Sequence, residues 1–242
     1  MSRGLLYIVF GKKCDEMASH TVAYSRQFTD LPICIVTNIK NRNEKWKEIS
    51  NVSFVKINDK LENNRDYKTQ MNKYTPFDET IYIDCDSVIQ RKGIEDIFDT
   101  ASAETDLILN CYLKWEVGDK VIRLYKKAMI IAGVNLPLNI YNGAFIYFKK
   151  NIRVDNFFST WNQLWKSTGG GREMPALSCS IKKSDINTGV LKKGVFSPDV
   201  FIEDSVVQHN YGPDFFDKYS IPKIRLFKNF DGDVTDWNWV EL

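Results

Sequence analysis

Short apolar runs alternate with helical segments along the first half of the chain, and this alternation is the strongest constraint on its fold. Strands are predicted at residues 5–10, 33–36, 52–57 and 80–83, and helices at 15–28, 44–49 and 66–74. A repeated strand–helix order is typical of a mainly parallel sheet that carries helices on its faces. We therefore predict an α/β protein.

The fourth of these strands ends in two carboxylates, Asp84 and Asp86, separated by Cys85. Side chains alternate along an extended strand, so two acids one residue apart point the same way or converge at a turn. Hard oxygen ligands at the end of a strand are well placed to hold a divalent cation against phosphate oxygens. Aspartates are also common in solvated turns. Because open α/β sheets bind ligands at the carboxyl ends of their strands, we interpret this pair as functional.

The composition argues against several other classes of protein. The chain has 33 Lys and Arg against 31 Asp and Glu, and a net charge of +2 gives no reason to expect a nucleic-acid partner. Its five cysteines form no CxxC pair and only two histidines are present, so we expect reduced thiols and no zinc cluster. No apolar run reaches the roughly 18 residues of a membrane helix, and the N-terminus lacks the apolar core of a signal peptide. We expect a soluble, cytoplasmic protein with no membrane span.

The second half of the chain is less regular, and no boundary of a second domain is visible. Strands are expected at 106–109, 143–148, 195–196, 199–202 and 221–227, and helices at 120–132 and 154–165. Trp161 and Trp165 share one face of the last helix and are expected in the core. Three adjacent glycines at 169–171 then break the chain, as a linker or as a mobile flap over a site.

The segment from Lys68 to Asp86 is similar to the nucleotide-diphospho-sugar transferases of the GT-A fold, particularly to glycogenin-like family 8 and its relatives. In those proteins a helix bearing Lys or Arg precedes Pro, an aromatic residue and Asp, and then comes a hydrophobic strand that ends in Asp-x-Asp. Pro76-Phe77-Asp78 and Asp84-Cys85-Asp86 match this order. Residues 36–38 and 141–148 also resemble the family, and the resemblance covers residues 4–150 well and the remainder loosely.

The resemblance implies one GT-A domain over residues 1–242, with a mixed, mainly parallel sheet flanked by helices. Residues 1–110 would form the nucleotide-binding half, and residues 111–242 would form the donor-sugar and acceptor half. The implied activity is metal-dependent transfer of a sugar from a nucleoside diphosphate sugar, most simply a UDP sugar, to a hydroxyl acceptor on a glycan or another biomolecule.

The resemblance also implies roles for individual residues. Asp86 would bind Mn²⁺ or Mg²⁺ directly, and Asp84 would bind the metal or the ribose hydroxyls. His209 is the third candidate metal ligand, although the Lys-Pro-Trp element that usually follows this histidine in family 8 is missing here. Lys68 would neutralise the diphosphate and Asn142 would bind hydroxyls of the transferred sugar. The full set expected to contact the donor is Val9, Phe10, Gly11, Thr37, Asn38, Lys68, Asp84, Cys85, Asp86, Asn142 and Gly143.

Two further acids, Glu173 and Asp204, are predicted to join Asp86 as catalytic residues. Glu173 resembles the acid that opens the helix after the donor-sugar strand, although the helix dipole alone also favours an acid there. Asp204 follows a short apolar run beside Glu203. In an inverting enzyme one such carboxylate would deprotonate the acceptor hydroxyl, whereas a retaining enzyme needs no conventional base. The sequence leaves this choice open.

Three other functions fit parts of the sequence. A phosphohydrolase of the haloacid dehalogenase type matches residues 84–88 literally, and Glu203 with Asp204 could imitate its acidic pair. In that class, however, the nucleophilic Asp normally ends the first strand. A sugar-phosphate nucleotidyltransferase would need a Gly-rich basic loop after the first strand, which residues 11–13 imitate poorly. The third alternative is a sugar-binding module that has no catalytic activity.

Overall fold

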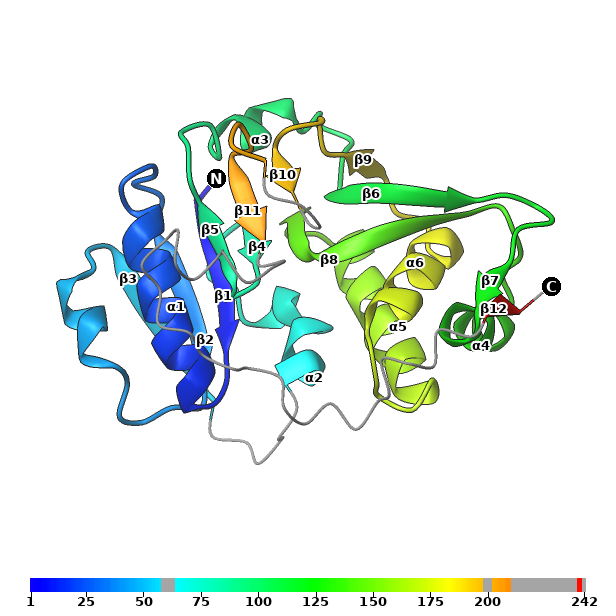
Figure 1. The fold of residues 1–242 in the computed structure, drawn as a ribbon, viewed down its shortest axis with the longest axis horizontal. Coiled ribbons are helices and arrows are strands. Elements are labelled where there is room, and N and C mark those ends of the chain that lie inside the picture. Colours follow the sequence, from blue (N-terminus) through cyan, green and yellow to red (C-terminus); the bar gives the residue numbers. More distant parts are fainter. Residues whose placement is uncertain (58–63, 198–201, 210–238, 241–242) are drawn as a thin grey trace.

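The computed structural model describes residues 1–57, 64–197, 202–209 and 239–240. At its centre lies a seven-stranded sheet with the strand order β3-β2-β1-β4-β8-β6-β9 (Figure 1). These strands are β1 (Arg3–Val9), β2 (Ile33–Thr37), β3 (Val52–Lys56), β4 (Glu79–Ile83), β6 (Leu107–Trp115), β8 (Leu138–Lys149) and β9 (Thr188–Val190). Within this described sheet only β8 is antiparallel to its neighbours, which are β4 and β6. The predicted mixed, mainly parallel sheet is confirmed.

Helices cover both faces of the sheet. One face carries α1 (Lys12–Ser25), the 3₁₀ helix η1 (Glu44–Glu48) and α3 (Asp96–Thr100), and the other carries α2 (Asn64–Lys68), η2 (Met71–Lys73), α4 (Arg123–Ala132), α5 (Ile152–Ser167) and α6 (Met174–Lys183). The alternation of side chains along β1 produces this division, since Leu6 and Ile8 pack in one core cluster and Leu5 and Tyr7 in the other. Trp161 is fully buried in the cluster under α5, as predicted.

Two small sheets extend this core. β5 (Ser87–Ile89) pairs antiparallel with β11 (Val207–His209), and β11 also pairs with β10 (Phe196–Ser197). β7 (Val121–Ile122) pairs with β12 (Trp239–Val240) beside α4. The pairing of β11 with β5 is the one that matters for the site, because it returns a late segment of the chain to the end of β4 (Figure 1).

Several element boundaries differ from the predictions. The first helix begins at Lys12, three residues earlier than predicted, and ends at Ser25. The helix predicted over 66–74 is instead two short pieces, because the backbone leaves the helical conformation at Gln70, which has φ −134° and ψ 22°. The strand predicted over 143–148 is the second half of the longer β8. The strand predicted at 221–227 and most of the one at 199–202 lie outside the described residues.

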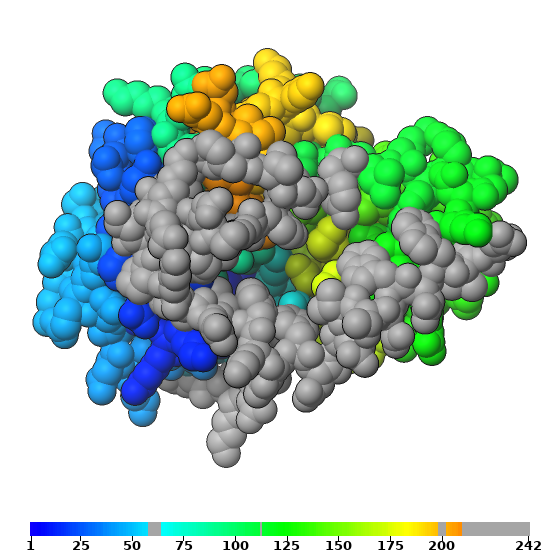
Figure 2. Space-filling view, in the orientation of Figure 1, coloured from blue at the N-terminus to red at the C-terminus, as the bar shows by residue number. Residues whose placement is uncertain are grey.

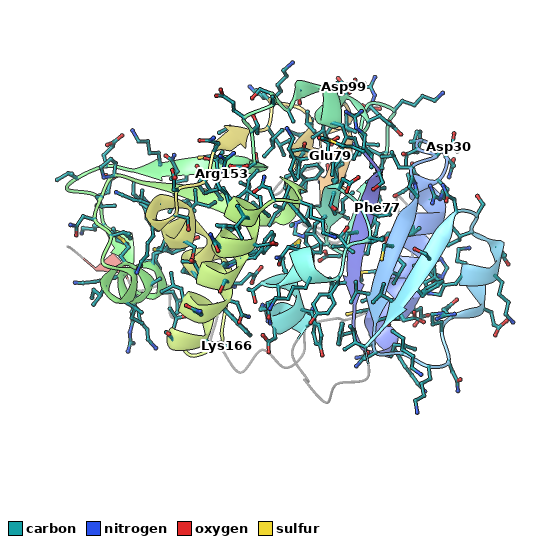
Figure 3. All side chains as sticks on the ribbon, turned by 180° about the vertical axis from the view of Figure 1, so that it is seen from behind. Asp30, Phe77, Glu79, Asp99, Arg153 and Lys166 are labelled. Carbon is teal, nitrogen blue, oxygen red and sulfur yellow. The ribbon has the colours of Figure 1, made fainter. Side chains whose placement is uncertain are left out.

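Ion pairs link the amino-terminal ends of β1 and β4 to each other and to α3. Arg3 reaches Glu79 of β4 and Asp99 of α3, each at 2.8 Å, and Figure 3 shows both acids near the same end of the molecule. Glu79 is the first residue of β4, whereas Asp84 directly follows the last one, so these ion pairs and the two aspartates lie at opposite ends of the strand. Among the helices within the described ranges, none is long and apolar enough to cross a bilayer.

Candidate active site

The chain turns sharply after β4, at residues 84–86. The amide of Asp84 donates to the carbonyl of Ala144 in β8 at 3.0 Å, and the amide of Ser87 donates to the carbonyl of Asp84 at 3.1 Å. Because β1, β2 and β4 are parallel, their carboxyl ends meet at this edge. The turn therefore places two aspartates where open α/β sheets bind their ligands.

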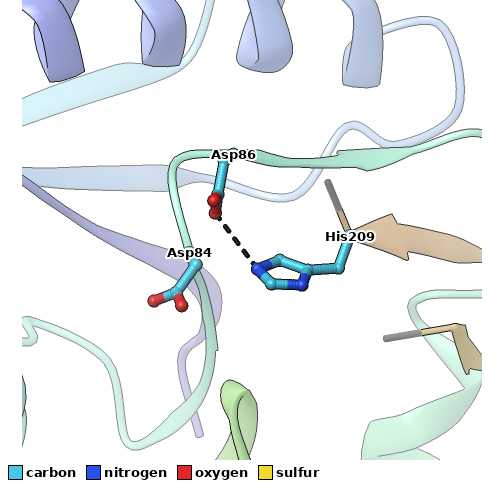
Figure 4. Close-up of side chains that lie close together, drawn as sticks. All are labelled: Asp84, Asp86 and His209. Atoms are coloured by element: carbon cyan, nitrogen blue, oxygen red, sulfur yellow. Dashed lines mark ion pairs between the residues drawn. The ribbon is translucent and has the colours of Figure 1, made fainter. Parts of the chain in front are cut away.

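Asp84, Asp86 and His209 form one cluster, as the sequence predicted for the metal ligands (Figure 4). One potential ligand atom from each lies within 4.8 Å of the others. His209 arrives through the pairing of β11 with β5, in which it stands opposite Ser87, and its Nε2 lies 3.3 Å from Oδ1 of Asp86. Two carboxylates and an imidazole make a donor set that suits Mn²⁺ and tolerates Mg²⁺. The residues present therefore fit a divalent cation.

The surroundings of Asp86 favour its charged form. Burial alone raises the pKa of this carboxyl group, but the interaction with His209, the local backbone and the more distant Lys68 together lower the pKa below its ordinary value. A carboxylate that stays ionised in a half-buried turn is available as a cation ligand.

Lys68 lies at the centre of a second group of charges beside this cluster. Its Nζ is 3.0 and 3.1 Å from the two carboxylate oxygens of Asp84, and 2.9 Å from Oε1 of Glu173. The side chain is only 10% exposed. Burial alone lowers the pKa of this lysine, but Asp84 and Glu173 outweigh burial and raise it. Lys68 is therefore a buried cation next to the predicted metal site. It is not a solvated charge on the surface of a helix.

Glu173 caps the start of α6 and is held by two cations. Besides Lys68, Nε of Arg65 lies 3.1 Å from its Oε2. Burial raises the pKa of this carboxyl group, but Lys68 and Arg65 lower it by more, to about 2. Gly143 leaves space beside the pair, since a methyl group there would lie 3.4 Å from Oε1 of Glu173 and 3.6 Å from Cε of Lys68. The absent side chain keeps this side of the site open.

The residues predicted to hold the nucleotide lie at the ends of β1 and β2. The amide of Gly11 donates to Oδ1 of Asn38 at 3.2 Å, which ties the two strand ends together. Gly11 has φ +80°, a backbone conformation that residues with a side chain rarely adopt. Val9 and Thr37 are buried, and the ring of Phe10 stacks on Tyr67 with centroids 4.5 Å apart. Because the Phe10 ring packs on Tyr67, it is mainly the backbone at the end of β1 that can contact a ligand.

Asn142 and Cys85, which were also predicted to contact the nucleotide sugar, form hydrogen bonds within the protein instead. Oδ1 of Asn142 accepts a hydrogen bond from the amide of Ala144 at 2.7 Å. The thiol of Cys85 hydrogen bonds with Cys14 of α1, and this contact together with burial raises the pKa of Cys85 well above its ordinary value. Cys85 therefore faces α1, and the candidate metal site contains its two neighbours in sequence together with His209.

Asp204 lies apart from the cluster. Its carboxylate is exposed and pairs with Arg91, which lies five residues after Asp86 in the chain. At roughly 3.3 Å per extended residue, five residues span up to about 16 Å, and β5 lies between Asp86 and Arg91. The position gives no support to the predicted role of Asp204 as a base, and no contact among the described residues joins it to the cluster.

Two partners of the site were not predicted from the sequence. The hydroxyl of Tyr82 donates to Oδ1 of Asp84, and Arg65 pairs with Glu173. Both had a signal in the sequence. Tyr82 stands two residues before Asp84 on the same side of the strand, and Arg65 precedes Lys68 by three residues, about one helical turn.

Comparison with known proteins identifies the fold. No protein-family model matches the chain, and no curated protein matches it by sequence. Among solved structures, the galactosyltransferase LgtC in complex with donor and acceptor sugar analogs superposes with a TM-score of 0.58 at 11% identity, over 87% of each chain. The apo structure of the bifunctional glycosyltransferase WbbM gives 0.58 at 11% identity, over 93% of this chain and 50% of that one. Mouse xyloside xylosyltransferase 1 gives 0.56 at 11% identity, over 81% and 87%.

These similarities establish the architecture and confirm the predicted class of fold. The chain has the GT-A fold of the nucleotide-sugar glycosyltransferases. At about one residue in nine identical, the neighbours carry no information on which sugar or acceptor this chain would use. The choice of substrate depends on the residues of the site itself.

Proposed function

We propose that this chain is a metal-dependent glycosyltransferase that moves a sugar from a nucleoside diphosphate sugar, a UDP sugar in the simplest case, to a hydroxyl acceptor. The observation that carries this proposal is the convergence of Asp84, Asp86 and His209 beside the buried cation Lys68. A cation site and a fixed positive charge at the ligand-binding edge of a GT-A sheet are what a leaving diphosphate requires.

Asp84, Asp86 and His209 would hold Mn²⁺ or Mg²⁺ in this proposal. The bound cation would neutralise negative charge on the diphosphate as the bond to the sugar breaks. Lys68 would add a second positive charge from the protein side, since its ammonium group already lies against Asp84 and Glu173. The ammonium group of Lys68 is already held in place, so it would need little reorganisation as charge develops on the diphosphate.

The remaining residues would bind and orient the donor. The backbone at 9–11, with Thr37 and Asn38, lies where the base and ribose would sit at the ends of β1 and β2. Asn142 and Gly143 lie on the opposite side, where β8 passes the turn after β4. Gly143 would face the transferred sugar, and Asn142 would hold this part of β8 in place through its hydrogen bond with the amide of Ala144. Gly143 provides room for that sugar because a side chain there would project toward Glu173 and Lys68.

We assign Glu173 to holding Lys68 and lining the donor side of the site, and we do not assign it to proton removal. A carboxylate with a pKa of about 2 between two cations is a weak base, whereas a general base works best with a pKa near the operating pH. Asp204 has no role in the proposal, because it lies at the far end of the β5–β11 pair.

The phosphohydrolase alternative is not favoured. Its chemistry needs Asp84 to attack phosphorus, but this carboxylate accepts hydrogen bonds from Lys68 and Tyr82, and the fold is GT-A. The nucleotidyltransferase is weakened as well, since the proposed basic loop at 11–13 lies largely within the first turn of α1.

The proposal is tested by combining thermal shifts with turnover. The purified chain is melted with a panel of nucleotide sugars, with and without Mn²⁺, and release of nucleoside diphosphate is then measured with a panel of hydroxyl acceptors. We expect a donor-dependent rise in melting temperature that needs the metal, because a ligand that binds only the folded state stabilises it by mass action. Asp86→Asn should lose both signals, and the exposed Asp30→Asn should keep both. Release of phosphate from small phosphoesters in place of sugar transfer would contradict the proposal.

A further inference from the structure

Exposed apolar side chains gather at one end of the molecule, away from the proposed active site. Five of the nine large hydrophobic residues that are exposed in the described part of the chain fall between residues 113 and 131. They are Leu113 (40% exposed), Val117 (80%), Leu124 (45%), Ile130 (69%) and Ile131 (41%). Isolated exposed apolar residues are common on soluble proteins, but a contiguous group of this kind marks an interaction surface.

The helix α4 explains how these residues come to share a surface. Its inner face packs in the core through Tyr125, Ala128, Met129 and Ala132. At 3.6 residues per turn, Leu124, Ile130 and Ile131 then fall on the opposite side, together with Arg123 and Lys127. A helix whose inner face satisfies the core has no structural need for three branched apolar residues on its outer face.

The end of β6 packs against the inner face of α4 and leaves its outer face open. Trp115 packs edge-on against Tyr125 of the inner face, with ring centroids 4.9 Å apart. Residues of this region, drawn in green, project at one end of the molecule in Figure 2. We call the outer face of α4 the docking face.

The charges on the docking face have one dominant sign. The ten residues of α4 include Arg123, Lys126 and Lys127 and no acid. Residues 113–131 as a whole carry five cations and two acids, whereas the entire chain has an excess of only two positive charges. The rest of the chain is therefore slightly acidic, and the positive excess is concentrated beside the exposed apolar residues.

We propose that the docking face binds the surface of a membrane that contains anionic lipids. A helix with apolar and cationic side chains on its outer face can lie in the plane of a lipid interface, where apolar groups enter the acyl boundary and cations meet the headgroups. Such binding needs no membrane-spanning helix. A second copy of this chain is a poorer occupant, because a symmetric contact would bring Arg123, Lys126 and Lys127 against the same cations of the partner.

Vesicle sedimentation tests this proposal with the full chain. The wild-type protein should sediment with vesicles that contain about 30% phosphatidylglycerol, and binding should weaken in high salt. It should sediment much less with pure phosphatidylcholine. Lys126→Glu/Lys127→Glu should weaken binding at least about tenfold, because each cation near an anionic surface contributes about fivefold. Ile130→Ser/Ile131→Ser should weaken binding several-fold at unchanged charge.

Matched controls separate the docking face from general charge and hydrophobicity. Ile152 is 72% exposed on a different helix, and Lys56 is exposed on the edge strand β3. Ile152→Ser/Lys56→Glu should bind vesicles like the wild type. Ile130→Ser/Ile131→Ser and Ile152→Ser/Lys56→Glu should keep the wild-type melting temperature, since these side chains are exposed. Lys126→Glu/Lys127→Glu also removes the hydrogen bond from Lys127 to the carbonyl of Thr168, so its vesicle binding is compared at a temperature at which calorimetry shows that it is folded. Equal sedimentation with anionic and neutral vesicles, or wild-type binding by both docking-face variants, would overturn the proposal. A different result would also overturn the proposal. In that result, light scattering shows that the wild type is a dimer and that Ile130→Ser/Ile131→Ser is a monomer, and neither the wild type nor this variant binds vesicles.

Discussion

Replacing Lys68 by Met tests the charge arrangement of the site without any substrate. The substitution keeps most of the apolar stem and removes the ammonium group that lies within about 3 Å of Asp84 and Glu173. Removing one partner of a buried ion pair costs about 3–5 kcal/mol, because it leaves an uncompensated buried charge. Here Arg65 still pairs with Glu173 and Tyr82 still donates to Asp84. We therefore expect the lower end, about 3 kcal/mol.

For a chain of this size, about 3 kcal/mol corresponds to a fall in melting temperature of roughly 6–12 °C. Mn²⁺ should restore part of this loss, since it supplies positive charge next to Asp84, so the metal should stabilise the variant more than the wild type. Calorimetry at fixed pH with and without Mn²⁺ measures both effects. Lys68→Arg, which keeps the charge, and the exposed Lys56→Met serve as controls. The reasoning is refuted if Lys68→Met melts within about 2 °C of the wild type, or if Mn²⁺ raises both melting temperatures equally.

Three further predictions concern the neighbouring residues. The lowering of the Glu173 pKa from 4.5 to about 2 contributes on the order of 3 kcal/mol of stability that is present above pH 4.5 and lost as the pH falls toward 2. The stability gap between the wild type and Glu173→Gln should therefore shrink over that range in pH-dependent melting, and a constant gap would refute it. Gly143→Ala should melt within a few degrees of the wild type but lose about tenfold in kcat/KM, as its methyl group crowds the donor side. Gly4→Ala should do the reverse and unfold more easily, since its methyl group would meet the Phe77 ring at 2.4 Å; similar effects of the two substitutions on turnover would contradict this. Asp204→Asn should change turnover less than about twofold and stability by less than about 0.5 kcal/mol, because its ion pair is exposed; a large loss of turnover would restore its predicted role as a base.

The sheet and the pair of acids at the end of β4 could be predicted because their signals are local. Each parallel strand is a short apolar run followed by a helix, and β4 ends in its two acids within the same run of residues. His209 was reachable from the sequence only through the family resemblance, since the strand pairing that brings it to Asp86 joins residues more than a hundred positions apart.

The charge group around Lys68 depends on packing, which is why the sequence predicted it only in part. Lys68 and Glu173 were each singled out, but their contact requires α2 and α6 to meet over the same strand end. The break at Gln70, just after α2, is likewise surrounded by tertiary contacts, since Asn162 of α5 bonds to the hydroxyl of Thr69 and to Asp66. Local preference favoured one continuous helix over 66–74, and a tertiary contact overrode it. Asp204 pairs with Arg91 away from the cluster, and its role as a base stays a prediction.

The most direct test of the proposed chemistry is a crystal structure of the chain grown with Mn²⁺ and UDP, recorded with anomalous scattering at the manganese edge. The account predicts an anomalous peak bonded to Asp86 and His209, with Asp84 beside it and the diphosphate oxygens on its far side near Lys68. A nucleotide bound without manganese at these residues, or manganese bound only elsewhere, would contradict it.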